Sequence, residues 1–420
     1  MPLVMAISSP KPKCLLFANT DWYLYNFRLS LADKLRETGF EVVLVAPGGE
    51  YGPKMESLGY RWVPFEMRTR SINPLREIAV IMRLILLYRR ERPKLTHHFT
   101  IKCVLYGTVA ARVLGGISIV NSLTGLGYSL IASDRKAKLL RPVVRALCRS
   151  VLATSNGRVV LQNTDDRNLL VQAGIVQEHL TRVIRGSGVN TDRFRPSRTK
   201  GTSDTSGPVR VLFASRLLKD KGVLELLEAA KTLKEKSLSA EVLIAGSIYP
   251  DNPSSLSARD IEEMKNSGHV TYLGHVADMP SLLDSCDVVV LPSYYGEGTP
   301  RILIEAAAME KPVIACDIAG CRGIVNHGTN GLLVRPRDAT ALAAAIEVLV
   351  ARPKLREQLG KRGRRIVLDH FSERLVIDQT LKVYRELITL PCEEGIRGDP
   401  RRAICEGVSG SSGTSERQKA

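Results

Sequence analysis

The stretch KCLLFANTDWYLYNFRLSLADKLRETGFEVVLVAPGG (residues 13–49) decides the fold. It holds two short apolar runs, 13–19 and 41–46, separated by a segment reaching Arg36 whose apolar residues are spaced as in a helix. Pro and Gly residues close the second run and mark a turn. Because both runs are almost continuously apolar, they are typical of strands covered on both faces of a parallel sheet.

The same alternation continues along the chain and is interrupted once. Residues 196–208 (PSRTKGTSDTSGP) lack large apolar side chains and predict a linker. Before it, we expect further strands at residues 60–64, 95–99, 117–122 and 158–162, with helices such as 74–90 between them. After it, we expect strands at residues 209–214, 240–245, 270–273, 288–292, 312–316 and 331–334. The pattern predicts an α/β chain with two doubly wound, Rossmann-like domains, 1–195 and 209–371.

The end of the chain changes character. Residues 372–390 predict an amphipathic helix with Ser372 as its N-cap, which we expect to cross back to the first domain. Beyond it, residues 391–420 are rich in Gly, Ser and charge, and we expect a disordered tail without function.

Composition excludes several classes of protein. The 420 residues are 44% apolar and 25% charged, which is ordinary for a globular protein and excludes collagen-like, wholly disordered and polytopic membrane chains. Eight cysteines without a CxxC pair favour reduced thiols in a cytosolic setting over disulfides or zinc. The first residues do not resemble a signal peptide, and no run of about 20 apolar residues predicts a membrane span.

The net charge of +17 is concentrated in the first half. Residues 1–190 carry 27 Lys and Arg against 13 Asp and Glu, and residues 68–149 carry 16 against 3. An anionic surface should therefore be met by the first domain.

The segment YYGEGTPRILIE (294–305) is the most informative for chemistry. Glu297 lies in a loop whose flanking glycines allow close approach to a ligand. Glu305 follows eight residues later, on a helix that Pro300 can begin and whose positive N-terminal end favours an anion. The spacing alone is common, and two solvated carboxylates would produce it as well.

Two cations provide a second signal. Arg216 and Lys221 follow the apolar run 209–214 and precede the next expected helix, where ligands of such sheets bind. A guanidinium and an ammonium at this place could hold a diphosphate leaving group, although a pair of surface cations is the simpler alternative.

Five short motifs stand in one order along the chain: Gly188-Val189-Asn190…Phe194, Ser215-Arg216…Lys221-Gly222, Tyr272-Leu273-Gly274, Leu291-Pro292-Ser293 and Glu297…Glu305-Ala306. Together they resemble the retaining glycosyltransferases of family 4, over roughly residues 13–390. The resemblance implies the GT-B fold, in which two Rossmann-like domains face a central cleft. It also implies a nucleotide-sugar donor with uracil as its base, and no divalent metal or other cofactor.

The resemblance assigns roles to residues of the second half. Arg216 and Lys221 would hold the diphosphate, Glu297 the donor sugar and Glu305 the ribose. Together with His98, the first three form the expected catalytic set. The wider donor site would consist of Gly188, Asn190, Gly274, His275, Val276, Gly296, Gly298, Thr299, Pro300, Arg301 and Ile302. The leaving phosphate would take the acceptor proton, so no side chain is expected to act as the general base.

The first half is similar to family members that add a hexose or N-acetylhexosamine to undecaprenyl-diphosphate-linked sugars in polysaccharide, O-antigen or glycoprotein assembly. The stretches at 18–35, 97–107 and 121–130 carry this likeness. The expected acceptor-binding residues are Asp21, Arg28, His97, Lys102, Gly125 and Gly127. Either His97 or His98 could be the functional histidine, and Asp21 could equally cap the following helix.

Basic helix faces beside apolar ones suggest where such an enzyme would work. Arg76, Arg83 and Arg90 recur every seven residues, and a similar basic face lies within 135–149. We expect this domain to attach peripherally to the anionic inner face of the cell membrane, although the apolar faces could instead pack on the sheet. A soluble acceptor is the alternative within the family. A UDP-sugar epimerase and a non-catalytic binder of anionic polymers are more distant alternatives, and no nucleic-acid motif is present.

Overall fold

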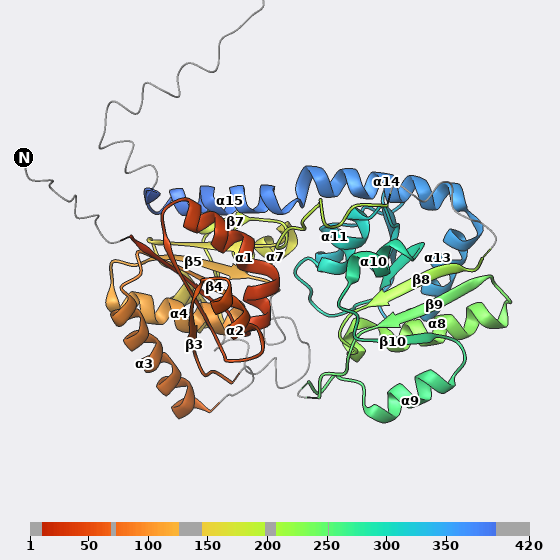
Figure 1. The fold of residues 1–420 in the computed structure, drawn as a ribbon, viewed down its shortest axis with the longest axis horizontal. Coiled ribbons are helices and arrows are strands. Elements are labelled where there is room, and N and C mark those ends of the chain that lie inside the picture. Colours follow the sequence, from red (N-terminus) through yellow and green to blue (C-terminus); the bar gives the residue numbers. More distant parts are fainter. Residues whose placement is uncertain (1–10, 69–72, 126–144, 198–206, 251, 392–420) are drawn as a thin grey trace, which may run out of the picture.

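The computed structural model describes residues 11–68, 73–125, 145–197, 207–250 and 252–391, which form two parallel β-sheets side by side (Figure 1). The first sheet has seven strands in the order β3-β2-β1-β4-β5-β6-β7. Their bounds are β1 Lys13–Phe17, β2 Glu41–Ala46, β3 Arg61–Pro64, β4 Leu95–Phe99, β5 Ser118–Leu123, β6 Gly157–Leu161 and β7 Thr181–Val183. All but the last were expected; β7 is three residues long, too short to show a pattern.

The second sheet has six strands in the order β10-β9-β8-β11-β12-β13, again all parallel. Their bounds are β8 Val209–Ala214, β9 Ala240–Ala245, β10 Thr271–Gly274, β11 Val288–Leu291, β12 Val313–Cys316 and β13 Gly331–Val334. Both sheets follow the doubly wound order in which the chain reverses direction beside the first strand. The predicted α/β fold with two Rossmann-like domains is confirmed.

Helices cover both sheets (Figure 1). Those of the N-terminal domain are α1 Asp21–Glu37, α2 Tyr51–Ser57, α3 Pro74–Glu91, α4 Ile101–Leu114 and α7 Thr164–Gln172. Those of the C-terminal domain are α8 Val223–Glu235, α9 Ala258–Asn266, α10 Met279–Asp284, α11 Arg301–Ala308, α12 Ala319–Arg322, α13 Ala339–Ala351 and α14 Pro353–His370. The final helix is α15 Glu373–Arg385.

Strand β1 shows why both faces need helices. Cys14 and Leu16 pack into one apolar cluster, whereas Leu15 and Phe17 pack into another on the opposite face. Successive side chains of a strand point to opposite faces, so a continuous apolar run can be buried only between two helical layers.

Helices α14 and α15 run end to end along both domains (Figure 1). At the junction of these two helices, Val189 forms two backbone hydrogen bonds. Its N–H donates to Phe371 O at 3.0 Å, and its carbonyl accepts from Glu373 N at 2.9 Å. Val376, Leu381 and Tyr384 of α15 then enter the core of the N-terminal domain. The C-terminal helix therefore belongs to the first domain by packing.

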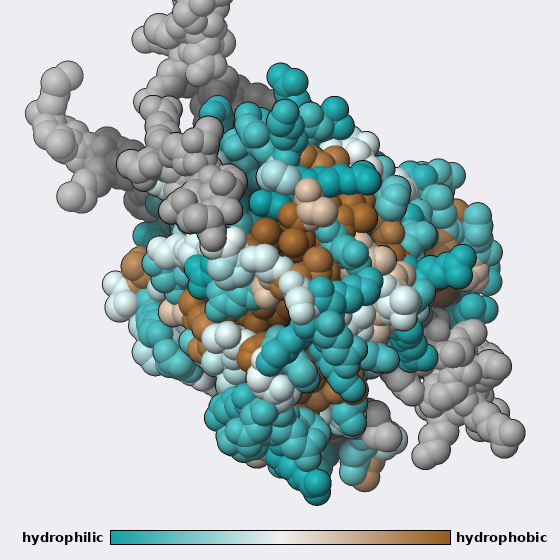
Figure 2. Space-filling view, turned by 90° about the vertical axis from the view of Figure 1, so that its right-hand side faces the viewer, coloured by the Kyte–Doolittle hydropathy of each residue, from teal (hydrophilic) through white to brown (hydrophobic). Residues whose placement is uncertain are grey.

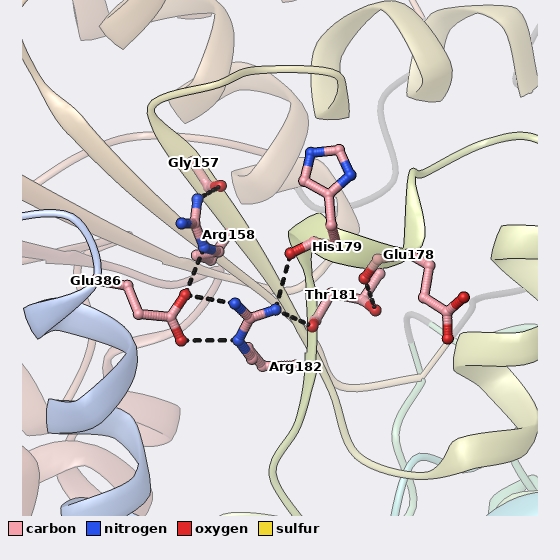
Figure 3. A network of polar contacts seen from close by, with 7 residues as sticks. All are labelled: Gly157, Arg158, Glu178, His179, Thr181, Arg182 and Glu386. Carbon is pink, nitrogen blue, oxygen red and sulfur yellow. Dashed lines mark hydrogen bonds and ion pairs between the residues drawn. The ribbon is translucent and has the colours of Figure 1, made fainter.

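A polar clamp fixes the end of α15 (Figure 3). Glu386 accepts hydrogen bonds from Arg158 Nε of β6 at 2.7 Å and from Arg182 Nε and Nη2 of β7 at 2.7 and 2.6 Å. Burial raises the pKa of Glu386, but the two guanidinium groups outweigh burial and hold this pKa below its ordinary value. The clamp joins segments more than 200 residues apart in sequence.

Hydrophobic side chains also reach the surface at the far end of the C-terminal domain. Figure 2 looks onto this end and shows a hydrophobic patch surrounded by hydrophilic side chains. Among the residues that the structure describes, no helix is both long enough and apolar enough to cross a membrane.

Tyr384→Phe tests the docking of α15. The Tyr384 hydroxyl lies 2.6 Å from Nδ1 of His97, and both side chains are buried. Its removal leaves a buried ring nitrogen without that partner, so we expect a loss of about 1–3 kcal/mol in unfolding free energy. Urea unfolding followed by tryptophan fluorescence reports on this domain, because Trp22 and Trp62 are the two tryptophans of the chain.

The matched control is Tyr249→Phe, whose ring is 44% exposed, with an expected change within about 0.5 kcal/mol. Equal unfolding midpoints for the wild type and both variants would contradict the importance of the buried hydroxyl.

Candidate active site

The loops after β8, β9, β10 and β11 meet at one edge of the second sheet. Leu217 N donates to Ser247 O at 3.0 Å, and Gly246 N donates to Gly274 O at 2.7 Å. Tyr294 N donates to Asp220 O at 3.1 Å. The carboxyl ends of parallel strands share one edge, so the expectation that these loops gather is confirmed.

Glu297 lies at the centre of the glycine-rich loop, residues 294–300, and forms an ion pair with Lys221. The same carboxylate oxygen accepts a hydrogen bond from Ser293 Oγ at 2.9 Å. Burial raises the pKa of Glu297, but Lys221, Ser293 and Arg216 together outweigh burial and hold it below the ordinary value. The structure thus brings together three of the residues predicted for catalysis: Glu297, Lys221 and Arg216.

Arg216 differs from Lys221 in its surroundings. Its side chain is exposed, and its guanidinium carbon lies 5.6 Å from the ring centroid of Tyr249. Within the described part of the chain no ion pair holds it, so its five donors can turn to an incoming anion. The described residues also contain no cluster of three or more His, Cys, Asp or Glu that could bind a metal ion.

Glu305 and Arg301 form the second charged pair, both on α11. Arg301 Nε donates to Glu305 Oε1 at 2.6 Å. Burial of Glu305 raises its pKa more than Arg301 lowers it, so this carboxyl is the easier of the two to protonate. Arg301 Nη1 also donates to Ser187 Oγ at 3.3 Å, and its Cζ lies 4.6 Å from the ring centroid of Phe27. These contacts link α11 to α1 and to the crossover, the segment after β7 that leads to the C-terminal domain.

The glycine-rich loop contacts the N-terminal domain directly. A Cβ on Gly298 would lie 2.1 Å from Gln162 Oε1, and one on Gly125 would lie 3.1 Å from Gly296 O. Such separations require glycine at position 298, because a methyl group would collide with the other domain. The predicted acceptor residue Gly127 lies outside the described residues.

The remaining predicted donor residues lie around the same edge. Gly274 has φ +68° and open space around its Cα, His275 is exposed, and Val276 packs partly on the core. Pro300 occupies the N-cap of α11, and Ile302 packs on the core from the first turn. A base or ribose could approach the open backbone at Gly274.

Gly188 and Asn190, which were predicted to bind the donor, make contacts within the protein. A Cβ on Gly188 would lie 2.6 Å from the Cα of Glu373, so this glycine allows the crossover to pack on the start of α15. The side chain of Asn190 accepts hydrogen bonds from the backbone N–H groups of Asp192 and Arg193 at 3.0 and 2.9 Å. Through these contacts, Gly188 and Asn190 shape the crossover that leads from β7 to the C-terminal domain.

The two predicted histidines are both buried, and they lie on opposite faces of the first sheet. His98 is fully buried between Tyr88 Oη at 2.9 Å and Asn121 Oδ1 at 2.8 Å, on the side of the sheet covered by α3. Both ring nitrogens are used, and burial lowers the pKa of His98 to about 4. The predicted catalytic role of His98 would require these bonds to change. His97 points to the opposite face, as alternation along a strand requires.

His97 helps to line a small polar pocket with Arg28, Ser122 and Gln162. Its Nε2 lies 2.7 Å from Ser122 Oγ, and burial, followed by the charge of Arg28, lowers its pKa well below the ordinary value. The imidazole is therefore neutral. Arg28 is 6% exposed, its Nη2 donates to Tyr23 Oη at 2.6 Å, and its Nε has no partner among the described atoms.

Asp21 and Lys102 have partners within the domain. The Asp21 carboxylate accepts from the N–H groups of Tyr51 and Gly52 at 2.8 and 3.1 Å and so fixes the start of α2. The helix cap that Asp21 could have supplied comes instead from Thr20, which accepts from Tyr23 N at 3.2 Å. Lys102 pairs with Glu77 at 2.9 Å. An acceptor role for either would require these bonds to change.

Three residues that shape the site have no assigned role in the sequence-based prediction. Ser293 stands in the Leu291-Pro292-Ser293 motif, and Gln162 ends an expected strand, so both were marked without a function. Gly320 of α12 lies under the loop, and a Cβ there would be 2.1 Å from Gly298 O. Nothing in the sequence near Gly320 indicates this contact.

Comparisons with known proteins agree with this geometry. The family described as "Glycosyl transferases group 1" matches residues 198–366, and the family "Glycosyl transferase 4-like" matches residues 13–154. The two matches follow the C-terminal and N-terminal domains.

Two bacterial relatives are similar over most of their length. The N,N'-diacetylbacillosaminyl-diphospho-undecaprenol alpha-1,3-N-acetylgalactosaminyltransferase of Campylobacter jejuni is 29% identical over 87% of this chain and 96% of its own. The UDP-Gal:alpha-D-GlcNAc-diphosphoundecaprenol alpha-1,3-galactosyltransferase of Escherichia coli is 25% identical over 76% and 82%.

Solved structures share the architecture. A glycosyltransferase from Rickettsia africae superposes with a TM-score of 0.73 at 20% identity, covering 90% of this chain and 99% of its own. Anabaena HepE in complex with UDP gives 0.70 at 18% identity, covering 89% and 100%. At these identities the likeness establishes the fold. That fold is GT-B, and the two family matches identify the chain as a glycosyltransferase with a group 1 domain and a 4-like domain.

Proposed function

We propose that this enzyme transfers a hexose or N-acetylhexosamine from a UDP-sugar to a saccharide carried on a polyprenyl diphosphate. The observation that carries the proposal is the Lys221–Glu297 pair beside the exposed Arg216, at the strand edge where such sheets bind ligands. The acceptor class is supported by the C. jejuni and E. coli relatives, whose names specify diphospho-undecaprenol acceptors. A UDP donor is supported by the name of the E. coli relative.

The charges suggest how donor binding proceeds. When the diphosphate arrives, Lys221 exchanges its bond to Glu297 for a phosphate oxygen, and Arg216 binds from the exposed side. Glu297 is then free to accept hydrogen bonds from the sugar hydroxyls. The two cations stabilise the charge that develops on the leaving diphosphate, which is where a metal ion would otherwise act. The reaction proposed is therefore metal-independent.

Retention of configuration accounts for the lack of an assigned base. The acceptor hydroxyl attacks on the face from which the diphosphate leaves, and the leaving phosphate oxygen takes the hydroxyl proton. Glu297 stays ionised at neutral pH and stabilises positive charge on the sugar ring.

Helix α3 supports docking on the inner face of the cell membrane. Val80, Leu84 and Leu87 bury one face of it. A second apolar stripe is exposed: Leu75 78%, Ile78 57%, Met82 53% and Leu86 61%. Arg76, Arg83 and Arg90 lie exposed on the same helix. An apolar stripe flanked by cations fits an anionic leaflet, with about 1 kcal/mol for each cation near the surface.

Calorimetric titration with UDP tests the donor site. We expect micromolar binding that is unchanged by EDTA and is weakened at least about tenfold in Arg216→Ala, because a charge-assisted phosphate contact is lost. Arg259→Ala, on the exposed face of α9, is the control and should bind like the wild type. Binding that disappears with EDTA, or that Arg216→Ala leaves intact, would contradict the proposed site.

Glu297→Gln tests the sugar contact. We expect kcat to fall at least about 100-fold while the protein stays folded, because an ionised group at the reacting sugar is lost. The pKa of Glu297 is lowered in the folded state. The stabilisation from its ion pair is therefore fully present at pH values above the ordinary pKa of a glutamate, and it is lost only as the pH falls through the lowered pKa. Transfer should therefore show no acid-side loss from Glu297 between about pH 5.5 and 8.

For the same assay Glu228→Gln, on the exposed face of α8, is the control with the same change of charge. A Glu297→Gln enzyme with wild-type kcat would remove Glu297 from the proposed mechanism.

Sedimentation with vesicles containing phosphatidylglycerol tests the membrane contact. The double substitution Ile78→Asp with Leu86→Asp should lower vesicle affinity at least about tenfold, because each exposed apolar side chain loses its burial in lipid. The control with equal charge is Leu224→Asp with Leu368→Asp in the C-terminal domain, where 43% and 46% of the side chains are exposed. A wild-type protein that stays wholly in the supernatant at low salt would favour a soluble acceptor instead.

A further inference from the structure

Gln162 connects the N-terminal domain to the glycine-rich loop by two hydrogen bonds to one residue. Its Oε1 accepts from Thr299 N at 2.7 Å, and its backbone carbonyl accepts from Thr299 Oγ1 at 3.3 Å. The next residue, Asn163, donates from Nδ2 to Gly298 O at 3.4 Å. The end of β6 thus holds the loop at two consecutive residues.

The held residue is placed where a displacement would matter. Thr299 stands two residues after Glu297 and directly before Pro300, the N-cap of α11. No side chain caps α11 at Pro300, and the hydrogen bond that Gln162 Oε1 accepts from Thr299 N fixes the chain directly before this helix. A shift at Thr299 would therefore move both Glu297 and the pair formed by Arg301 and Glu305.

The close fit of the loop makes the contact sensitive to geometry. A Cβ on Gly298 would lie 2.1 Å from Gln162 Oε1 and 2.5 Å from Thr124 O. On its other side the loop rests on Gly320, where a Cβ would be 2.5 Å from Glu297 O. The loop is thus closely packed between Gln162 and Thr124 of the N-terminal domain and Gly320 of the C-terminal domain.

Behind the loop, Gln162 also borders the buried polar pocket of the N-terminal domain. Arg28, His97, Ser122 and Thr380 line this pocket, whose volume of about 10 Å³ is at the lower limit for holding one water molecule. Thr380 belongs to α15, so Gln162 stands between the loop and the helix that crosses back from the other domain.

We propose that Gln162 is a positioning residue for sugar transfer: it holds Thr299, and through Thr299 it keeps Glu297 facing the donor sugar. Gln162 makes its contribution through the loop and not through the substrate. The inference rests on the proposed function, because it assigns Gln162 a part in the same reaction.

Two substitutions of similar size separate the hydrogen bond from packing. Gln162→Met removes the acceptor oxygen, whereas Gln162→Glu keeps an oxygen that can accept from Thr299 N. We expect Gln162→Met to lower kcat by about 10–100-fold, because a small misplacement of a reacting group has effects of that size. Its affinity for UDP should stay within about threefold, since Arg216 and Lys221 lie outside the contact. Gln162→Glu should retain most of the wild-type kcat.

Hydrogen–deuterium exchange of the peptide covering 294–301 gives a readout that needs no activity. We expect faster exchange at Thr299 in Gln162→Met and wild-type exchange in Gln162→Glu. If the wild type binds no UDP-sugar and transfers nothing, the proposed function fails, while the exchange experiment still decides whether Gln162 holds the loop. Wild-type kcat and exchange in Gln162→Met, or equal losses in the Met and Glu variants, would overturn the proposal.

Discussion

Parallel pairing of buried strands is the constraint on which the rest of the molecule depends. A strand inside such a sheet satisfies its backbone with neighbours on both sides and must be covered by helices on both faces. The carboxyl ends of the strands then lie along one edge, and the loops that follow them come together there. Lys221 after β8 and Glu297 after β11 are 76 residues apart, and they meet because β8 and β11 are neighbours.

The two carboxylates of one short segment have opposite electrostatic environments. Glu297 is buried but faces Lys221 and Ser293, and its pKa is lowered. Glu305 is buried beside Arg301, and its pKa is raised because burial outweighs the charges of Arg301 and Arg193. Environment, and not spacing, gives the two carboxylates their opposite pKa shifts.

The two domains are connected by more than the linker. The chain crosses between them near Val189 and again at the junction of α14 and α15, and the glycine-rich loop is bonded to Gln162. The N-terminal domain therefore supplies part of the frame of a loop that belongs to the C-terminal sheet. The exposed apolar stripe and the cations of α3 lie on the same domain as Gln162. The proposed membrane docking and the proposed positioning of the loop would therefore both involve the N-terminal domain.

The sequence by itself determined the strands, their parallel pairing and the loops that carry Arg216, Lys221, Glu297 and Glu305, because continuous apolar runs and glycine-rich turns are local signals. Only the tertiary structure decided what surrounds the two buried histidines, since alternation along β4 sends His97 and His98 to opposite faces without saying what covers each face. It also showed the contacts that Asp21, Gly188 and Asn190 make within the protein and revealed Gln162 and Gly320. Contacts between segments far apart in the chain depend on how whole layers pack, and no local pattern records that distance.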